Sequence, residues 1–389
     1  MKRSNILSKF SRRFAIAAVT STLSMTTFLV GSASAAPAST PVTNSTGSGF
    51  IGGFNKVSGV ASTVPSLGKS RAGNGDVNPY GVAVVAASSG ALVAGDVLVS
   101  NFNDAANNQG TGVTIMQISP AGKASVFANL SGQVKGPIGL TTALSVFDNG
   151  DVVVGSLPTT NGKASTATAG ALYVLNSHGK VIETIKGGEI NGPWDMTAYT
   201  NGKSGVLFVT NVLNGTVAAN GKDVAEGTVV RVTLNLSVSP PKVQRETVIG
   251  SGFAEATNAS ALVLGPTGDG LAANGTLYVA DTLANRVAAV PNALHRTTSD
   301  GTGTTVSTGE FLKAPLGLAI APNGDILTVN GNDGEITETT PQGQQVNWVF
   351  LDSSSSPQGA GALFGLAVQP GNKGIYFVDD VENQLNLFN

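Results

Sequence analysis

The sequence predicts an all-β fold: a six-bladed β-propeller with four antiparallel strands in each blade. Short runs rich in Val, Ile, Leu and Tyr recur between Gly, Asn and Asp, which is typical of strands and tight turns. Each run follows a second run whose opening is similar and commonly has Gly as its third residue. The six openings are Pro79–Val84, Pro137–Leu140, Pro193–Met196, Ser260–Leu264, Pro315–Ile320 and Leu363–Val368.

The spacing of these openings indicates one repeating unit. Aligned positions fall at 81, 139, 195, 261, 317 and 365, so successive units are 48 to 66 residues long. That length accommodates four short strands and their turns. A single four-stranded blade cannot bury both of its faces, whereas blades stacked around an axis bury each face against the next. Asn149-Gly150 and Asn323-Gly324 are suited to the hairpin turns between the first two strands.

The N-terminal region predicts export. A basic start, an interrupted apolar stretch and Ala33-Ser34-Ala35 follow the order of a cleavable secretory signal, expected at residues 1–35, although a retained membrane anchor is the alternative. Residues 36–49 have the composition of a flexible linker, and residues 50–389 are expected to form a single propeller. We therefore expect a secreted or periplasmic protein with no membrane span after removal of the signal.

The two ends of the mature chain are expected to close the ring together. The sequence stops at Leu385–Asn389, which reads as the third strand of the sixth repeat, so that repeat lacks a fourth strand. The segment around Phe50–Val60 precedes the first opening and can supply it. Pairing of these two segments would protect the last exposed strand edge.

Composition narrows the chemistry. The 389 residues contain no Cys and only two His, which excludes disulfides, thiolate metal sites and cysteine nucleophiles. The two histidines, His178 and His295, lie in expected loops and form no evident triad or zinc site. The formal net charge of −2 gives no electrostatic reason to expect nucleic acid as a partner.

One segment carries a family resemblance. Residues 275–287 hold a strand that ends in Asp281, a loop with Asn285, and Arg286 at the start of the next strand. This order closely resembles the centre of an NHL-type repeat, found in six-bladed β-propellers that include exported, bacterial-type proteins. Residues 374–385 are similar, with Gln384 in place of Arg. The resemblance implies the fold, while the architecture hosts unrelated activities.

The second strand of most repeats ends in an amide or a carboxylate. Equivalent positions in a ring lie at similar height around the axis, so these side chains are expected at one mouth of the channel. Asp281, Asp379 and Asn330 could supply oxygen ligands to Ca²⁺ there, whereas hydrogen bonding to the local turns is the alternative. The full set of strand-end candidates is Asn101, Asn211, Asp281, Asn330 and Asp379.

Asp195 is a separate candidate. It stands in the third position of its opening, where most other openings have Gly, and it follows Trp194. An acidic side chain at an inner position could face the channel as a ligand or base. The alternative is a hydrogen bond to nearby backbone.

The sequence is compatible with two functions, and we first expect binding without catalysis. In that reading the propeller is a scaffold for a protein or a glycan. The alternative is a Ca-assisted lactonase or ester hydrolase similar to the gluconolactonase and paraoxonase propellers, acting on a small molecule. The early Glu of those families has no counterpart at Tyr80–Val82. An activity similar to that of streptogramin lyases is a third option, but no His base is evident.

Overall fold

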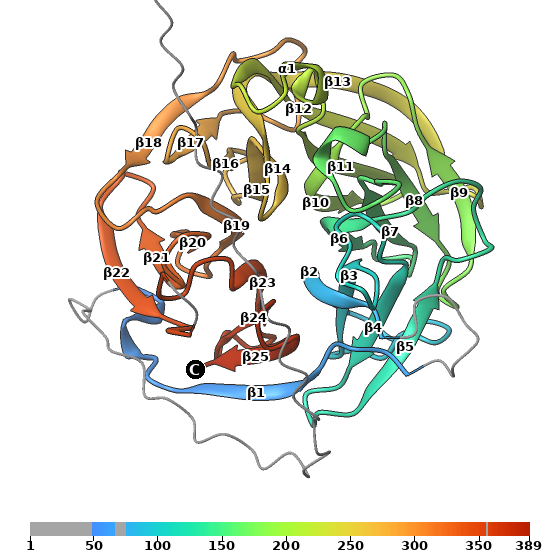
Figure 1. The fold of residues 1–389 in the computed structure, drawn as a ribbon, viewed down its shortest axis with the longest axis horizontal. Helices are drawn as coiled ribbons and strands as arrows, with labels where there is room; N and C mark the ends of the chain where they lie inside the picture. The colour runs from blue at the N-terminus through green and yellow to red at the C-terminus, as the bar shows by residue number, and fades with distance from the viewer. Residues whose placement is uncertain (1–48, 67–74, 355–356) are drawn as a thin grey trace, which may run out of the picture. The chain divides into compact units, whose positions relative to one another are not determined.

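The computed structural model describes residues 49–66, 75–354 and 357–389. They form six antiparallel sheets arranged in a ring, which is the predicted six-bladed β-propeller (Figure 1). The expected signal, and all but the last residue of the expected linker, lie outside the described residues. No helix in the described part of the chain is long and apolar enough to span a membrane.

The first three blades are built from consecutive strands, and in each the first strand lies nearest the centre. Blade 3 carries a fifth, short strand after its fourth. Blade 1 contains β2 (Val77–Val84), β3 (Val97–Asn103), β4 (Thr114–Ile118) and β5 (Ala124–Asn129); blade 2 contains β6 (Leu140–Val146), β7 (Val152–Ser156), β8 (Ala171–Leu175) and β9 (Val181–Ile185); blade 3 contains β10 (Pro193–Asn201), β11 (Ser204–Asn211), β12 (Val224–Asn235), β13 (Lys242–Asn258) and β14 (Leu262–Leu264).

The last three blades follow the same order, except that the outermost strand of blade 6 comes from the N-terminal side. The described helices are single short turns: η1 (Ile51–Gly53), η2 (Ala164–Thr166) and α1 (Thr216–Ala219). Blade 4 contains β15 (Pro266–Leu271), β16 (Leu277–Asp281), β17 (Arg286–Val290) and β18 (Thr304–Thr308); blade 5 contains β19 (Pro315–Ile320), β20 (Ile326–Asn330), β21 (Glu335–Thr339) and β22 (Gln345–Phe350); blade 6 contains β23 (Leu363–Val368), β24 (Ile375–Asp379), β25 (Gln384–Phe388) and β1 (Val57–Ser62).

The ring closes as the sequence predicts. Strand β1 pairs antiparallel with β25, with Val57 opposite Phe388 and Ser62 opposite Gln384. The segment before β1 is held by the buried carboxylate of Glu338, which accepts a hydrogen bond of 3.0 Å from the backbone N–H of Ile51. The N-terminal segment therefore completes blade 6 and also contacts blade 5.

Two of the predicted openings are displaced. In blade 2 the inner strand begins at Leu140, and Pro137 precedes it. In blade 4 the inner strand is β15, so the predicted opening Ser260–Leu264 is wrong. The apolar run in that stretch forms β14, which pairs with β13 of blade 3. Its side chains are buried for another reason, because they cover one mouth of the channel.

Glycine at the third position of an opening has a steric reason. A Cβ at Gly317 would lie 2.0 Å from the carbonyl oxygen of Phe364, and one at Gly365 would lie 2.2 Å from that of Tyr80. The backbones of neighbouring inner strands thus approach too closely for a side chain. The predicted hairpin turns also form, with Gly150 at φ 86° and Gly324 at φ 89°.

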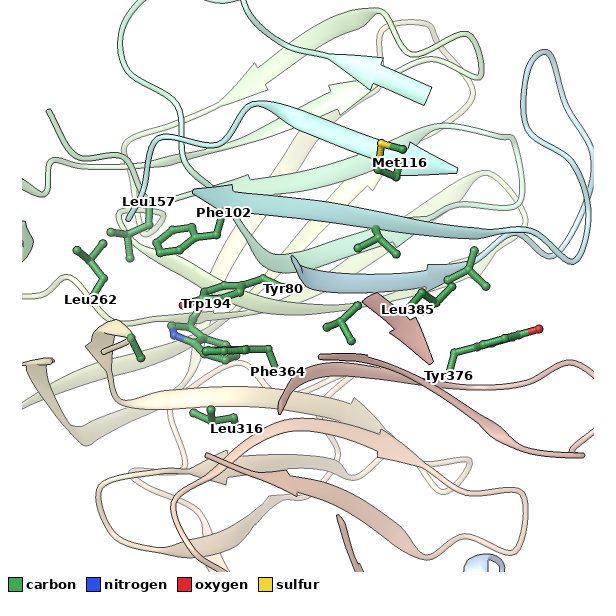
Figure 2. Packing of buried hydrophobic residues seen from close by; sticks show 14 of the residues in the cluster. Tyr80, Phe102, Met116, Leu157, Trp194, Leu262, Leu316, Phe364, Tyr376 and Leu385 are labelled. Carbon is green, nitrogen blue, oxygen red and sulfur yellow. The ribbon is translucent and has the colours of Figure 1, made fainter. Parts of the chain in front are cut away.

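An aromatic cluster fills the mouth at which the inner strands begin (Figure 2). The ring of Tyr80 stacks between those of Phe364 and Phe102, with centroids 3.9 and 4.5 Å away. Trp194 donates a hydrogen bond from Nε1 to the carbonyl oxygen of Val263, which lies on β14. Buried aromatic surface and this bond hold β14 over the centre, so we call these five residues the mouth plug.

Candidate active site

The central channel is the best-formed cavity on the axis. It has a volume of about 380 Å³ and is lined by the later residues of all six inner strands. Each inner strand is the edge of its sheet, so backbone N–H and C=O groups line the channel together with side chains. Such a space suits a small polar ligand.

Asp195 lies on β10 and lines this channel. Its side chain is 9% exposed, and Oδ1 accepts a hydrogen bond of 2.8 Å from the backbone N–H of Met196. Burial raises the pKa of Asp195 to about 7, although the backbone N–H groups of Met196 and Asp269 partly offset the effect. Asp195 lines the cavity, which is consistent with the prediction that it could face the channel. Its hydrogen bond to the N–H of Met196 also matches the alternative, in which it binds nearby backbone.

Asp269 lies on β15, the inner strand of the next blade, and lines the same cavity. It is 3% exposed, and no described group donates a hydrogen bond of normal geometry to either carboxylate oxygen. Burial, and then the negative charge of Asp195, raise the pKa of Asp269 well above its usual value; Thr197 partly offsets this. The hydroxyl of Thr197 also donates to the carbonyl oxygen of Asp269 at 2.9 Å and ties the two inner strands together.

The two carboxyl groups form one titrating unit, which we call the carboxyl pair. Two buried acids that repel each other do not both ionise near neutral pH. Backbone N–H groups support the carboxylate of Asp195, whereas burial and the charge of Asp195 raise the pKa of Asp269 well above its usual value despite Thr197, so Asp269 is the protonated member. A pair that holds a base beside an acid can move protons in both directions.

The strand-end candidates occupy equivalent positions, as the sequence predicts. Each lies opposite the first residue of its own inner strand, or in blade 1 opposite the third, at the end of the blade where the mouth plug lies. The pairs are Pro79 with Asn101, Pro193 with Asn211, Pro266 with Asp281, Pro315 with Asn330, and Leu363 with Asp379.

The three strand-end amides make the same kind of contact. Each amide binds the backbone of the segment that leads into the inner strand of its own blade, which is a tethering role. All three are fully buried. Asn101 donates to the carbonyl oxygen of Thr63 at 2.9 Å, Asn211 accepts from the N–H of Gly192 at 3.3 Å, and Asn330 donates to the carbonyl oxygen of Phe311 at 2.7 Å.

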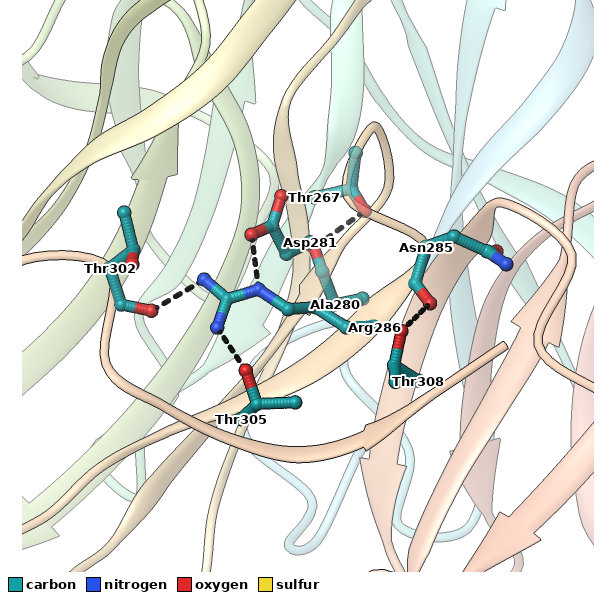
Figure 3. Close-up of polar contacts among 8 residues, drawn as sticks. All are labelled: Thr267, Ala280, Asp281, Asn285, Arg286, Thr302, Thr305 and Thr308. Atoms are coloured by element: carbon teal, nitrogen blue, oxygen red, sulfur yellow. Dashed lines mark hydrogen bonds and ion pairs between the residues drawn. The ribbon is translucent and has the colours of Figure 1, made fainter. Parts of the chain in front are cut away.

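The two strand-end carboxylates are also engaged within their blades. Asp281 accepts a hydrogen bond of 2.8 Å from Nε of Arg286, and the same guanidinium donates to the carbonyl oxygen of Thr302 (Figure 3). Asp379 accepts from the backbone N–H of Glu382 at 3.0 Å, and burial raises its pKa to about 7. Among the described residues, no group of three or more His, Cys, Asp or Glu side chains has the geometry of a metal site. These contacts match the turn-binding alternative, and calcium at Asp281, Asp379 and Asn330 stays a prediction.

The sequence analysis missed Asp269, although a signal was present. Pro266-Thr267-Gly268 has the Pro-x-Gly pattern of the other openings, and Asp269 directly follows it. Placing the opening at Ser260–Leu264 moved this acid out of the inner strand. With the correct alignment, two neighbouring openings each carry one acid at an inner position.

Comparisons with known proteins establish the fold. No family model matches the chain, and no curated protein matches it. Solved structures of similar fold include a gluconolactonase from Xanthomonas campestris, with TM-score 0.54 and 12% identity over 92% of this chain and 97% of that chain. A PQQ-bound aldose sugar dehydrogenase from Streptomyces coelicolor has TM-score 0.53 and 14% identity, covering 86% and 97%.

A third similar structure is a calcium-binding regucalcin from Agrobacterium tumefaciens. Its TM-score is 0.52 and its identity 13%, over 80% of this chain and 90% of that chain. Identities this low show a shared architecture, which hosts several chemistries. The NHL-type resemblance therefore stays a prediction, and the chain is a six-bladed β-propeller with gluconolactonase and regucalcin propellers among its structural neighbours.

Proposed function

We propose that this protein hydrolyses small polar esters or lactones in its central channel. The observation that carries the proposal is the carboxyl pair, which sits buried in a cavity large enough for a small ligand. Similar folds in a gluconolactonase and a regucalcin are compatible with it at the level of architecture. The N-terminal pattern of a secretory signal supports a place of action outside the cytoplasm.

Each member of the pair has one role in the proposed reaction. The carboxylate of Asp195 takes a proton from water as the water oxygen attacks the carbonyl carbon, forming a tetrahedral intermediate. The carbon–oxygen bond to the leaving group then breaks, and the protonated Asp269 gives its proton to the departing alkoxide. Transfer of the proton from Asp195 to Asp269 restores the starting state. Water is consumed, and an acid and an alcohol are formed.

The carboxyl pair is a better candidate site for calcium than the strand-end residues are. Both carboxylate oxygens of Asp269 are buried without a donor of normal geometry, and oxygen ligands of this type are those that Ca²⁺ prefers. Calcium would replace the shared proton: Asp195 and Asp269 would hold the ion as two carboxylates, with backbone carbonyls on the inner edges as further ligands, so this is an alternative to the proton transfers described above. A bound calcium ion would supply polarisation of the ester carbonyl.

The direct test is hydrolysis of a panel that contains glucono-δ-lactone, simple γ- and δ-lactones and phenyl acetate, with proton release followed by indicator. We expect turnover of at least one compound by the wild type. Asp195→Asn and Asp269→Asn should each lower kcat/KM by about 10²–10⁴-fold. Asp281→Asn is the matched control, because it changes a buried acid outside the channel and should keep the activity.

If no compound is hydrolysed, with CaCl₂ or with EDTA, the result would contradict the proposal that the protein is a hydrolase. The second contrary result is an equal loss of activity in Asp281→Asn and Asp269→Asn. The first result would favour the function expected first from the sequence, a scaffold that binds a protein or a glycan without catalysis. The second would show that the carboxyl pair is not the catalytic centre.

A further inference from the structure

A second cavity lies away from the channel, on blade 2. It has a volume of about 390 Å³, and its walls come from the segment that joins blades 1 and 2 and from strands β8 and β9. We call it the blade 2 groove. Tyr173 lies in its wall and is 6% exposed, while Pro137 and Pro158 add rigid apolar surface.

The charge of this groove has one sign. Lys135 and Lys186 line it, and no acidic side chain does. Among the ion pairs of the described residues, neither lysine has a partner. The nearest acid on β9 in sequence, Glu183, is on the other face of the strand and pairs with Lys242 at 2.7 Å. A concave site with two unpaired cations, in a chain of net charge −2, favours an anionic ligand.

The wall that carries Lys135 is fixed in place. The side chain of Gln133 accepts a hydrogen bond of 3.0 Å from the N–H of Val181 and donates to the carbonyl oxygens of Asn129 and Gly179 at 2.7 and 3.2 Å. The bonds to Val181 and Gly179 connect the joining segment to the β8–β9 hairpin, and the bond to Asn129 ties it to the end of β5. The groove is therefore formed before a ligand arrives, which lowers the cost of binding.

A second hollow continues from the groove. It has a volume of about 290 Å³. Val134 and Pro137 line both the groove and this hollow, so they form the wall between the two. Its other lining residues are uncharged and include the hydroxyl side chains of Thr111, Ser131 and Thr159. A ligand with an anionic unit and a neutral polar unit in succession would match both hollows.

We propose that the blade 2 groove binds an acidic oligosaccharide, with a uronate carboxylate at Lys135 and Lys186. Lysine ammonium groups supply the charge. Pro137 is exposed and offers apolar surface to a sugar face, whereas Tyr173 and Pro158 are buried in the wall, and ligand sites combine such surface with a few placed polar groups. The adjoining hollow takes the next, neutral sugar. This site is separate from the channel and does not depend on the hydrolase.

Calorimetry with defined ligands tests the proposal. The probe is tri-galacturonate, compared with neutral galactotriose, inorganic phosphate and sulfate at low ionic strength. We expect binding of the trigalacturonate that weakens as salt rises. Lys135→Gln with Lys186→Gln should weaken it at least tenfold. Lys163→Gln, an exposed lysine outside the groove lining, is the matched control and should bind as the wild type does.

Three results would overturn the proposal: equal affinity for galactotriose, equal affinity for inorganic phosphate or sulfate alone, or no loss in the double lysine variant with an unchanged melting temperature. The channel variant Asp269→Asn should still bind trigalacturonate. Failure of hydrolysis with intact binding would therefore reject only the hydrolase, and the reverse would reject only this groove.

Discussion

At the scale of single residues, burial decides what the acids of this protein do. Asp195 and Asp281 are both nearly buried carboxylates, yet Asp281 has Arg286 beside it and Asp195 has another acid. A carboxylate paired with a cation stabilises local structure, whereas two neighbouring carboxyl groups without a cation keep a proton at neutral pH. The channel pair is therefore the chemically unusual one.

The proposed base predicts the acid side of the pH profile. Asp195 must be ionised to accept a proton, and its pKa is about 7. We expect kcat/KM to fall as pH drops below about 7, and an alkaline limb to appear where Asp269 loses its proton. Asp269→Asn should remove the alkaline limb from the residual activity. A rate that stays constant from pH 5 to 9 would contradict these roles.

The Asp281–Arg286 pair predicts an asymmetry between two variants. Replacing Arg286 by Leu leaves the carboxylate of Asp281, whose side chain is 3% exposed, without its partner. We expect a loss of about 3 kcal/mol in the free energy of unfolding, since breaking a buried pair strands a charge. Asp281→Asn should cost less, because no charge remains buried. Urea denaturation measures both, and equal losses would show that stranded charge is not the cause.

Calcium binding can be placed by melting curves. If the channel pair holds the ion, millimolar CaCl₂ should raise the melting temperature relative to EDTA by mass action on the folded state. The shift should vanish in Asp269→Asn and persist in Asp281→Ala. The opposite pattern would place calcium at the strand ends, and no shift in the wild type would remove calcium from either place.

At the scale of elements, the N-terminal segment holds the ring together. Strand β1 covers the edge of β25, and Glu338 receives the N–H groups of Phe50 and Ile51. Ile51 is fully buried among side chains of blades 5 and 6. This short segment thus provides the outermost strand of blade 6, the buried side chain of Ile51, and a turn whose N–H groups bind the carboxylate of Glu338.

Removal of this segment predicts a large loss of stability. Deleting residues 36–62 exposes a strand edge and the cavity left by Ile51, so we expect a loss of about 3 kcal/mol or more. The melting temperature of the mature protein should fall by about 4 °C or more. Deleting residues 36–47 alone is the control and should have little effect. An unchanged melting temperature after the longer deletion would show that the closure is not stabilising.

At the scale of the whole molecule, buried acids set the dependence of stability on pH. Several carboxyl groups have their pKa raised by burial, so the folded state binds more protons than the unfolded state between about pH 4 and 7. Their contribution to stability is complete at pH values below their pKa in the unfolded state. It is lost as pH rises through their pKa in the folded state. The groups are Asp325, at about 6, and Asp195, Glu255, Glu335, Asp379 and Asp380, at about 7.

The protein is therefore expected to melt at a higher temperature at pH 5 than at pH 8. The difference should be about 5–10 °C in buffers of equal ionic strength. Replacing Glu255 by Gln should reduce it, because that group is fully buried and is among those with raised pKa. A melting temperature that rises with pH would mean that ion pairs such as Lys242–Glu183 dominate instead.

Local sequence patterns are enough to predict the architecture. Strand length, turn residues and recurring openings are local patterns, and they were sufficient to predict six blades and the pairing of β1 with β25. The pattern placed the inner strand of blade 2 slightly early and that of blade 4 on a competing apolar run. Leu262 and Val263 look like an inner strand, but they are buried because β14 packs against the aromatic side chains at the mouth of the channel.

The tertiary structure alone decided which acids meet. Asp195 and Asp269 are 74 positions apart in the sequence and become neighbours only because the inner strands β10 and β15 lie side by side. The strand-end residues share a position in five of the six blades, yet their side chains bind neighbouring segments of the chain. Repetition therefore predicts where a residue lies in a blade, and side-chain direction and burial determine what it contacts.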